Sequence, residues 1–434
     1  MELSRVSITP IAVFNFVLWL FFTLCFFYQI VYFVIGYFKN EIVLPKAKKQ
    51  HRFAFMIAAH NEEVVIAQLV KSILTQKYPR KLFDVYVVAD ACTDKTAKRA
   101  REAGAIVFER DDLARKGKSW ALDMGFNNVL HDKGESYYDA FIVFDADNLL
   151  SRDYLSEMNK LLDLGYLAGT SLRNSKNFDS SWVSAANAIW FLREARYLNN
   201  ARMLLNTSCA ISGSGWMVST DIIRGMQGWD FHLLTEDIQF STFCAAHGIK
   251  IGYAPAEFYD EQPVTFKASW IQRMRWTKGF YQVFFSYVGD LMKGISKRSF
   301  ASYDLLMTVG PAMLLTLMSA LVNSVYLFIG MFSNGFLATA DELSMCVGSL
   351  VMTFVSIYLV FFLIAAFTTC TERKRIHAKH KWRVITNVFT FPLWQMTYIP
   401  ITVIALFKKV EWVPTKHEFA LSVDEVTGLE DAKP

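Results

Sequence analysis

Two acidic residues after an apolar run are the strongest candidates for chemistry in this sequence. The segment IVFDADN, residues 142–148, places Asp145 and Asp147 two positions apart at the end of a predicted strand. Neighbouring carboxylates repel each other unless a cation lies between them or one of them binds a proton. Such oxygen ligands suit Mg²⁺ or Mn²⁺, which bind through one or two carboxylates and the phosphates of a substrate. The pair predicts a divalent-metal site, and the alternative is an acidic turn without a ligand.

Three further polar groups follow predicted strand ends or open a predicted helix. Asp90 comes directly after the apolar run 83–89, where a carboxylate can accept hydrogen bonds from a base or a ribose. The turn His60–Glu63 follows the run 53–59, and Lys116–Lys118 place cations at a helix start, where phosphate binds well. Taken alone, His60–Glu63 also fits a simple turn, and Lys116–Lys118 fits a solvated basic turn.

A glycine-containing segment, ISGSGWMV at residues 211–218, offers bare backbone followed by an indole. Gly213 and Gly215, with Ser214 between them, allow a ligand to approach the chain closely. The ring of Trp216 can stack on that ligand. The alternative is a tight turn that leads into a strand.

The segment LLTEDIQF, residues 233–240, has the pattern of a helix start. Thr235 is a predicted helix cap, and Glu236 and Asp237 fall in the first turn, where acidic residues are ordinary partners of the helix dipole. Only the other polar groups described above favour a functional role for these acids.

The segment IQRMRWTKGF, residues 271–280, combines cations and aromatics in a helical pattern. Gln272, Arg275 and Trp276 have the spacing i, i+3 and i+4, which puts them on one helix face. A guanidinium binds a diphosphate bidentately, and an indole stacks on a sugar ring. Arg273 and Lys278 point elsewhere and are predicted to meet lipid headgroups.

The elements that must position these residues form an alternating α/β pattern. Short apolar runs rich in β-formers alternate with stretches that favour helix, which predicts βαβ units and a mostly parallel, Rossmann-like sheet. Ligands of such sheets bind beyond the carboxyl ends of the strands, where these polar groups lie. The four runs are 53–59, 83–89, 105–109 and 139–144.

The composition indicates a soluble domain joined to membrane segments. Of the 434 residues, 53% are hydrophobic and 20% charged, which is too apolar for one soluble domain and too charged for spanning helices alone. The net charge of +5 is mild and favours contact with anionic headgroups over nucleic-acid binding. The six scattered cysteines lack metal-ligand spacing, which predicts reduced thiols.

Uncharged apolar segments flank the α/β region on both sides. The run 11–37 is long enough to span a bilayer, as are 305–332 and 343–368. Lysines and an arginine follow the first run, so the α/β domain is predicted to be cytoplasmic. Prolines interrupt 384–407, which either spans as a kinked helix or lies partly in the interface. The predicted domains are 1–38 (membrane helix), 39–290 (catalytic, with interface helices), 291–407 (membrane or interface helices) and 408–434 (tail).

The segment Ser181–Asn206 has two interpretations. It is rich in Trp, Leu and Arg, which fits an amphipathic helix at the membrane surface. It fits a core helix of the soluble domain equally well.

The ordered set of Asp90, DAD at 145–147, TED at 235–237 and QRMRW at 272–276 resembles the membrane-embedded glycosyltransferases of family 2. These are the relatives of cellulose, chitin and hyaluronan synthases. The resemblance covers about residues 50–290 in detail and the rest by the layout of membrane segments. It implies a GT-A-type fold, a UDP-sugar donor, Mg²⁺ or Mn²⁺ as cofactor, and a plasma-membrane location.

The resemblance also implies a role for each matching position. Asp237 would be the catalytic base on the acceptor hydroxyl, and Asp147 with Asp145 would hold the metal. Donor binding would involve His60, Glu62, Asp90, Lys118, Asp145 and Arg275. Acceptor binding would involve Gly213, Ser214, Gly215, Trp216, Gln272 and Trp276.

One motif of cellulose synthases, the FxVTxK gating sequence, does not follow QRMRW here. The segment WVPTKH, residues 412–417, is a candidate substitute in which Trp412, Thr415 and Lys416 would cover UDP. We expect that truncation after Phe407 would then impair turnover.

A single base predicts inverting, metal-dependent transfer that builds a β-linked polysaccharide and moves it through the spanning helices. The alternative is a single transfer that makes a glycolipid, as ceramide glucosyltransferases do with the same motifs. A transporter with a regulatory domain is disfavoured, because the apolar runs after residue 304 contain no charge. The donor sugar and the oligomeric state stay undetermined at this level.

Overall fold

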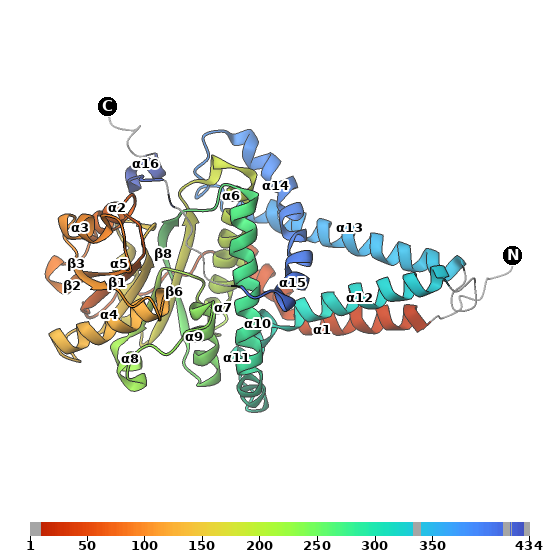
Figure 1. Ribbon diagram of the computed structural model, residues 1–434, viewed down its shortest axis with the longest axis horizontal. Coiled ribbons are helices and arrows are strands. Elements are labelled where there is room, and N and C mark those ends of the chain that lie inside the picture. Colours follow the sequence, from red (N-terminus) through yellow and green to blue (C-terminus); the bar gives the residue numbers. More distant parts are fainter. Residues whose placement is uncertain (1–9, 333–339, 411–416, 418, 429–434) are drawn as a thin grey trace.

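The computed structural model of the chain describes residues 10–332, 340–410, 417 and 419–428. An α/β body carries long helices that extend away from it in one direction (Figure 1). The body contains an eight-stranded sheet in the order β3-β2-β1-β4-β7-β6-β8-β5. Its strands are β1 (Phe53–Ala59), β2 (Phe83–Asp90), β3 (Ile106–Arg110), β4 (Ala140–Asp145), β5 (Leu149–Leu150), β6 (Ala168–Ser175), β7 (Trp216–Ser219) and β8 (Ile251–Asp260).

Parallel pairing is concentrated in the part of the sheet that comes first along the chain. β1 pairs in parallel with β2 and β4, and β2 pairs in parallel with β3. β7 pairs antiparallel with both β4 and β6, so the complete sheet is mixed. The α/β fold and all four predicted strands are confirmed. β7 follows the glycine-containing segment, whose alternative interpretation was a turn that leads into a strand, whereas β5, β6 and β8 were not predicted.

Successive strands are added first on one side of β1 and then on the other, so the strand order reverses between β1 and β4. β2 and β3 lie on one side of β1, and β4 returns to the other side. α2 (Ile66–Leu74) and α3 (Thr96–Glu102) cover one face of these strands, and α4 (Lys118–Lys133) covers the other (Figure 1). Such a reversal leaves a crevice at the carboxyl ends of the two central strands, which is where ligands bind in sheets of this kind.

The segment 181–206 is a core element of the body. α6 (Trp182–Arg193) buries residues around most of its circumference, and it packs against β6 and against α13 and α14 of the C-terminal region. A π-helical turn (Glu194–Asn199) and α7 (Asn200–Leu204) continue it. Protein therefore covers α6 both on the side of the sheet and on the side of the C-terminal helices.

The catalytic body and the C-terminal helices share one continuous helix. α10 runs unbroken from Phe266 to Ser296, so the predicted domain boundary at 290/291 falls inside it. The apolar run 305–332 is divided at Gly310 into α11 (Phe300–Val309) and α12 (Pro311–Phe332). The remaining helices are α5 (Tyr154–Asp163), α8 (Thr220–Met226), α9 (Glu236–Ala246), α13 (Ala340–Thr371), α14 (Lys381–Met396), α15 (Tyr398–Phe407) and α16 (Val423–Thr427).

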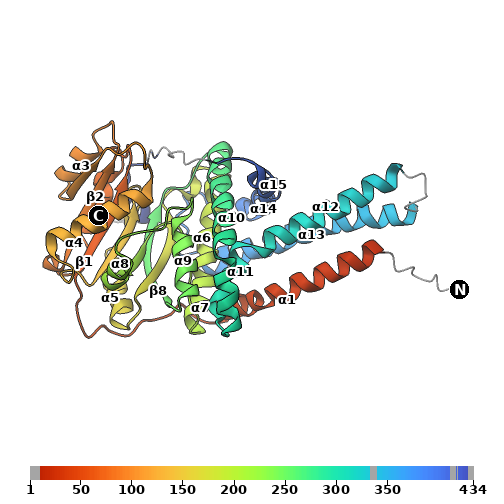
Figure 2. The same ribbon diagram turned by 60° about the horizontal axis from the view of Figure 1, so that its bottom comes forward.

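Three helices, α1 (Pro10–Phe38), α12 and α13, extend together from the body (Figures 1 and 2). By length and composition, the segments long and apolar enough to cross a membrane in the described chain are Pro10–Phe38, Val347–Thr371 and Lys381–Phe407. The last of these is divided into α14 and α15, and it runs across the base of the three extended helices (Figure 1).

A buried ion pair joins the body to the extended helices. The guanidinium of Arg202 on α7 donates to both carboxylate oxygens of Asp304 on α11, at 2.8 and 2.9 Å. Tyr28 and Tyr32 of α1 donate to the same carboxylate at 2.9 Å each. Every oxygen of the buried acid is therefore hydrogen-bonded, and the position of α1 relative to the catalytic body is fixed.

Candidate active site

A cavity of about 260 Å³ lies at the carboxyl ends of β1, β2 and β4, between the first turns of α4 and α9 and one face of α10. Segments far apart in the sequence meet there because parallel strands end at the same edge of the sheet. The cavity is lined by eleven of the predicted residues: His60, Glu62, Asp90, Lys118, Asp145, Asp147, Gly213, Asp237, Gln272, Arg275 and Trp276.

Three predicted acceptor residues do not line the cavity. Trp216 is fully buried in β7, where its ring stacks on Trp229 with centroids 5.1 Å apart. Gly215 has φ +66°, and a side chain there would collide with the ring of Phe258, so this glycine serves packing. Ser214 lies one layer deeper and accepts a hydrogen bond from the backbone N–H of Asp145 at 2.9 Å. The prediction that these residues contact a ligand is therefore wrong, because the chain enters the sheet directly after Gly213.

Trp412, Thr415 and Lys416, the predicted gating residues, lie outside the described residues. Two of their neighbours are described, and both touch the site. The ring of His417 lines the cavity, and the backbone of Phe419 accepts a hydrogen bond from the Lys176 ammonium at 3.0 Å. The tail thus returns to the α/β body, as the gating hypothesis for residues 412–417 requires.

Asp90 is engaged on both of its carboxylate oxygens. One is 2.5 Å from the Arg110 guanidinium, and the other accepts the backbone N–H of Gly117 at 3.3 Å. The His60 ring contacts the backbone carbonyl of Asp90 at 2.6 Å. These contacts hold the Lys116–Lys118 turn against the end of β2. The sequence analysis did not identify Arg110, because this residue belongs to no motif. Arg110 contributes to the site by pairing with Asp90 at the end of β2.

Lys118 links the acidic groups at the centre of the cavity. Its ammonium lies 2.7 Å from Asp145 and 3.2 Å from Glu236, and it donates to the Gly213 carbonyl at 2.9 Å. Burial opposes the charged form of Lys118, but the two carboxylates outweigh burial and raise its pKa. The pKa of Glu236 is also raised, by burial and despite the lysine. Asp237 accepts the backbone N–H of Gly213.

Asp147 also lines the cavity and lies near the tail. It accepts the backbone N–H of Glu261 at 3.0 Å, and the Nε2 atom of His417 is 3.9 Å from its Oδ2 atom. His417 Nδ1 contacts Glu62 at 3.0 Å. Burial disfavours the charged imidazole, yet the Asp147 charge and the Glu62 hydrogen bond raise the pKa of His417 to about 10.

A second ion pair that the sequence did not indicate supports this part of the cavity. The guanidinium of Arg173, at the end of β6, donates to Asp260, at the end of β8, with Nε 2.7 Å from Oδ2. Burial raises the pKa of Asp260 to about 6, although Arg173 opposes the shift. Both residues line the cavity, and only the adjacent positions of β6 and β8 in the sheet bring them together.

The predicted face of α10 is confirmed by its position in the cavity, whereas the predicted headgroup contacts are wrong. Arg273 is fully buried, 4.4 Å above the Trp394 ring, and donates to the Trp394 carbonyl at 2.9 Å. Lys278 donates to the carbonyl of Ala405 at 3.0 Å and thereby caps the end of α15. Both cations are covered because α14 and α15 pack along this side of α10.

The charges around the cavity fit a metal–diphosphate ligand better than a free diphosphate. Eight carboxylates line the cavity against four Lys and Arg side chains. No group of three His, Cys, Asp or Glu among the described residues forms a metal cage by itself. Mg²⁺ and Mn²⁺ commonly take only one or two protein carboxylates and complete their shell with phosphates and water. Asp147, with Asp145, provides a donor set of this kind.

The sheet, the crevice at its strand ends and the acidic cavity together fit the class of α/β enzymes that use a nucleotide-sugar. Sequence comparison assigns the family. The glycosyltransferase-like family 2 matches residues 51–279, more than half of the chain. The chain belongs to this family, and its predicted enzyme class is confirmed. The match begins just before β1 and ends within α10, so it contains every described predicted site residue.

Curated relatives of this chain include a protein named as a glycolipid synthase and one named as a polysaccharide synthase. The chain is 28% identical to the probable glycosyltransferase YdaM of Bacillus subtilis over 60% of this chain and 64% of that protein. It is 30% identical to a β-monoglucosyldiacylglycerol synthase of Nostoc over 55% and 51%, respectively. It is 25% identical to a poly-β-1,6-N-acetyl-D-glucosamine synthase of Staphylococcus aureus over 66% and 71%. The chain thus spans less than two thirds of the first two relatives.

A solved structure shares the fold. The mannosyltransferase PcManGT of Pyrobaculum calidifontis, solved with GDP-Man and Mn²⁺, superposes with a TM-score of 0.53 at 16% identity. The superposition covers 90% of this chain and 98% of that one. The likeness confirms the GT-A-type architecture. It includes elements outside the sheet, since the superposition covers 90% of this chain.

Proposed function

We propose that the chain transfers a hexose from a UDP-sugar, with inversion and with a divalent cation, to an acceptor hydroxyl held at the membrane surface. The observation that carries the proposal is the position of Asp237. Its carboxylate lines the same cavity as Asp145, Asp147 and Arg275, so a base and a diphosphate site face one ligand.

Direct displacement at the anomeric carbon needs one base on the acceptor side. Asp237 accepts the Gly213 N–H through one carboxylate oxygen, which fixes the orientation of the side chain and leaves the other oxygen for a hydroxyl proton. Lys118 holds Asp145 and Glu236, so the base is the acidic residue of this group without a lysine partner at salt-bridge distance. An attacking hydroxyl on one face of the sugar and a leaving diphosphate on the other give inversion.

The opposite wall supports the donor. Asp90, His60 and the Lys116–Lys118 turn would receive the uridine, while Arg275 would bind the diphosphate. Arg275 forms no hydrogen bond or ion pair with another described residue, which leaves its fork of N–H donors for phosphate oxygens. A bound Mg²⁺ or Mn²⁺ would neutralise the leaving diphosphate. Asp147 and Asp145 would hold that ion, with His417 nearby.

The helix arrangement favours a membrane lipid as the acceptor. One route for a polysaccharide within this chain would run between α1 and α12. Asn15 of α1 and Asn323 of α12 hydrogen-bond to each other in both directions, at 2.9 and 2.8 Å, so these two helices touch partway along their length. A lipid hydroxyl would instead reach α10 from the leaflet beside α14 and α15. Polysaccharide extension is the second candidate, favoured by the similarity to the poly-β-1,6-N-acetyl-D-glucosamine synthase.

The experiment that tests the function is a product analysis on the purified full chain in lipid vesicles. A panel of radiolabelled UDP-sugars is supplied, and released UDP, solvent-extractable lipid and high-mass polymer are measured separately. A single-sugar lipid adduct supports the first candidate, and a polymer supports the second. Absence of UDP release with every UDP-sugar, in a preparation that binds UDP, would contradict the donor class.

We expect truncation after Phe407 to lower UDP-sugar turnover strongly without unfolding the catalytic body. The truncation removes the predicted gating residues. It also removes the contact of the His417 ring with Glu62 and the hydrogen bond from the Lys176 ammonium to the Phe419 carbonyl. Turnover is measured as UDP release, and folding as the thermal midpoint. Truncation after Gly428, which keeps α16, is the matched control. A folded chain ending at Phe407 with wild-type turnover would contradict a role for the tail.

A further inference from the structure

The segment between α13 and α14 carries cations that the rest of the described chain leaves without partners. Arg373, Lys374, Lys379 and Lys381 are exposed, and none of them forms a hydrogen bond or ion pair with a described residue. Two acids lie beside the segment: Glu372 is buried and paired with Arg375 at 2.6 Å, and Asp179 accepts the backbone N–H of His380 at 3.0 Å. Neither forms an ion pair with the four cations, so the segment presents a net positive charge.

The helix that follows exposes an apolar face. Trp382, Ile385, Phe389 and Leu393 are each more than half exposed, and their spacing of three and four residues puts them on one side of α14. The other side packs against α6 through buried residues such as Phe391. α14 thus has one apolar side against the body and a second apolar side that is mostly exposed, where the Phe389 ring contacts Phe362 of α13 at a centroid distance of 5.0 Å. A continuous exposed stripe of large apolar side chains indicates an apolar environment rather than water.

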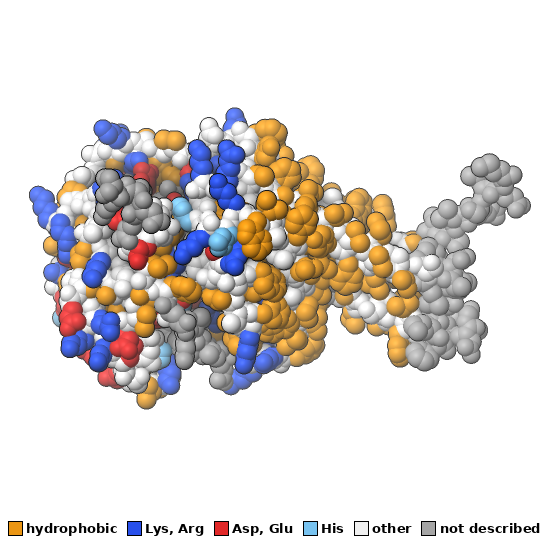
Figure 3. Space-filling view, turned by 90° about the horizontal axis from the view of Figure 1, so that it is seen from above, with side chains coloured by type: hydrophobic (Ala, Val, Ile, Leu, Met, Phe, Trp, Pro, Cys, Tyr) orange, Lys and Arg blue, Asp and Glu red, His pale blue; other side chains and the backbone are white. Residues whose placement is uncertain are grey.

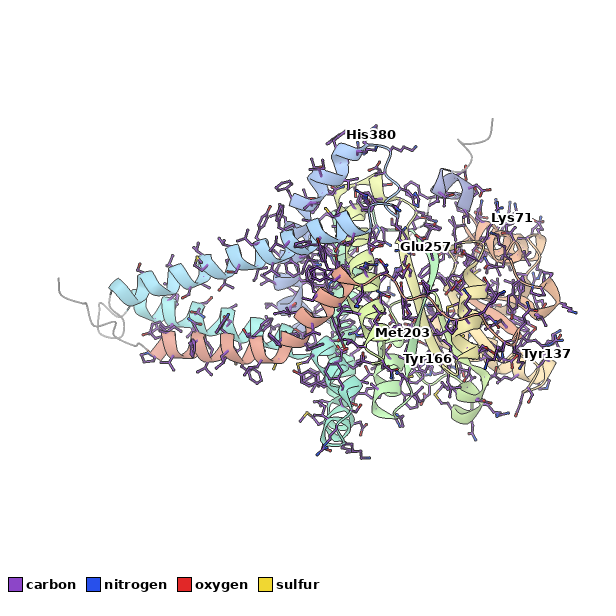
Figure 4. All side chains as sticks on the ribbon, turned by 180° about the vertical axis from the view of Figure 1, so that it is seen from behind. Lys71, Tyr137, Tyr166, Met203, Glu257 and His380 are labelled. Atoms are coloured by element: carbon purple, nitrogen blue, oxygen red, sulfur yellow. The ribbon has the colours of Figure 1, made fainter. Side chains whose placement is uncertain are left out.

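The order of these groups along the molecule is that of one membrane leaflet. Seen from above, Lys and Arg side chains gather next to the α/β body, and hydrophobic side chains follow toward the extended helices (Figure 3). His380, at the start of α14, lies at the edge of the body and away from the far ends of the extended helices (Figure 4). Cations at the headgroup level and apolar side chains below it characterise helices that lie in the interface plane.

We propose that α14 lies in the leaflet next to the catalytic body and that Arg373, Lys374, Lys379 and Lys381 bind anionic phospholipid headgroups. The occupant of this face is a lipid surface because the stripe adjoins α13, which is apolar and long enough to cross a membrane: the rings of Phe389 and Phe362 lie with centroids 5.0 Å apart. The attraction of such cations to an anionic surface falls off within a Debye length and weakens with salt.

This lipid contact would act on the active site through one buried residue. Arg273 of α10 is fastened to α14 and its C-terminal end by the Trp394 carbonyl and by the Thr397 hydroxyl at 2.6 Å. Its neighbours Gln272 and Arg275 line the cavity. Holding α14 in the leaflet therefore holds the ligand-binding face of α10 in place.

The test compares the full chain in nanodiscs of phosphatidylcholine alone with nanodiscs that also contain phosphatidylglycerol. Amide hydrogen exchange is followed in residues 381–396. We expect phosphatidylglycerol to slow exchange there several-fold, and we expect high salt to remove the effect. This readout needs no donor or acceptor, so its failure is distinct from failure of the proposed function.

The decisive variant replaces Arg373, Lys374, Lys379 and Lys381 by Gln and should lose the response to phosphatidylglycerol. The matched control makes the same change of charge at Lys98, Arg99, Arg101 and Lys133, which are exposed on α3 and α4, and should keep the response. The four cations of the segment make no side-chain contacts that folding requires. Equal exchange in both lipids for the wild type, or an unchanged response in the first variant, would overturn the proposal.

Discussion

Replacing Asp237 by Asn is expected to lower the rate of sugar transfer about 10²- to 10⁴-fold, the contribution of one positioned base. Asn keeps the size of the side chain and can still accept the Gly213 N–H, but it cannot take a proton from the acceptor hydroxyl. The donor side of the cavity is unchanged by the substitution. UDP binding should therefore stay close to that of the wild type.

The measurement separates binding from chemistry. Transfer to the acceptor and calorimetric binding of UDP with Mn²⁺ are determined on the same preparation. Asp230→Asn is the matched control, because Asp230 lies seven residues earlier and its side chain is 94% exposed. Full activity of Asp237→Asn would show that the base has been assigned to the wrong residue.

Asp147→Asn is expected to abolish metal-dependent UDP binding. The cavity wall is rich in carboxylates, so we expect a diphosphate to bind only when a divalent cation neutralises part of this charge. Removing even a group that only supports a metal ligand typically costs about 10–100-fold in metal affinity, and the loss of a ligand itself should cost at least that much. Asn retains the hydrogen bond from the Glu261 N–H, which limits structural damage.

Manganese binding followed by electron paramagnetic resonance provides a readout that does not depend on turnover. The wild type with UDP should bind Mn²⁺, and Asp147→Asn should bind it far more weakly. Asp153→Asn, an exposed position in the turn before α5, is the control for an equal loss of charge. If Asp147→Asn binds Mn²⁺ and UDP as the wild type does, the metal lies elsewhere.

The sequence by itself determined the features that depend on local periodicity. Gln272, Arg275 and Trp276 were placed together correctly because the pitch of a helix sets which residues share a face, whatever surrounds it. Asp145 and Asp90 were placed at one edge because each follows an apolar run, and parallel strands end at a common edge. The family motifs then supplied the roles that these positions are proposed to have.

Tertiary structure alone decided which polar and aromatic groups are covered. Arg273 was expected at the lipid surface, yet α14 and α15, more than a hundred residues later, bury it under Trp394. Trp216 was expected to stack on a ligand, yet β7 enters the sheet between β4 and β6 and turns its ring into the core. Helical or strand spacing specifies a direction for a side chain but not the element that lies in that direction.

The same limit applies to residues recruited from distant segments. His417 reaches Glu62 across 355 positions of sequence, and Arg173 meets Asp260 only because β6 and β8 pair in the sheet. No local pattern encodes these approaches, since they result from the packing of complete elements. The sequence thus determined the chemical groups of the site and the edge where they collect, and the packing of distant elements decided which of them face the ligand.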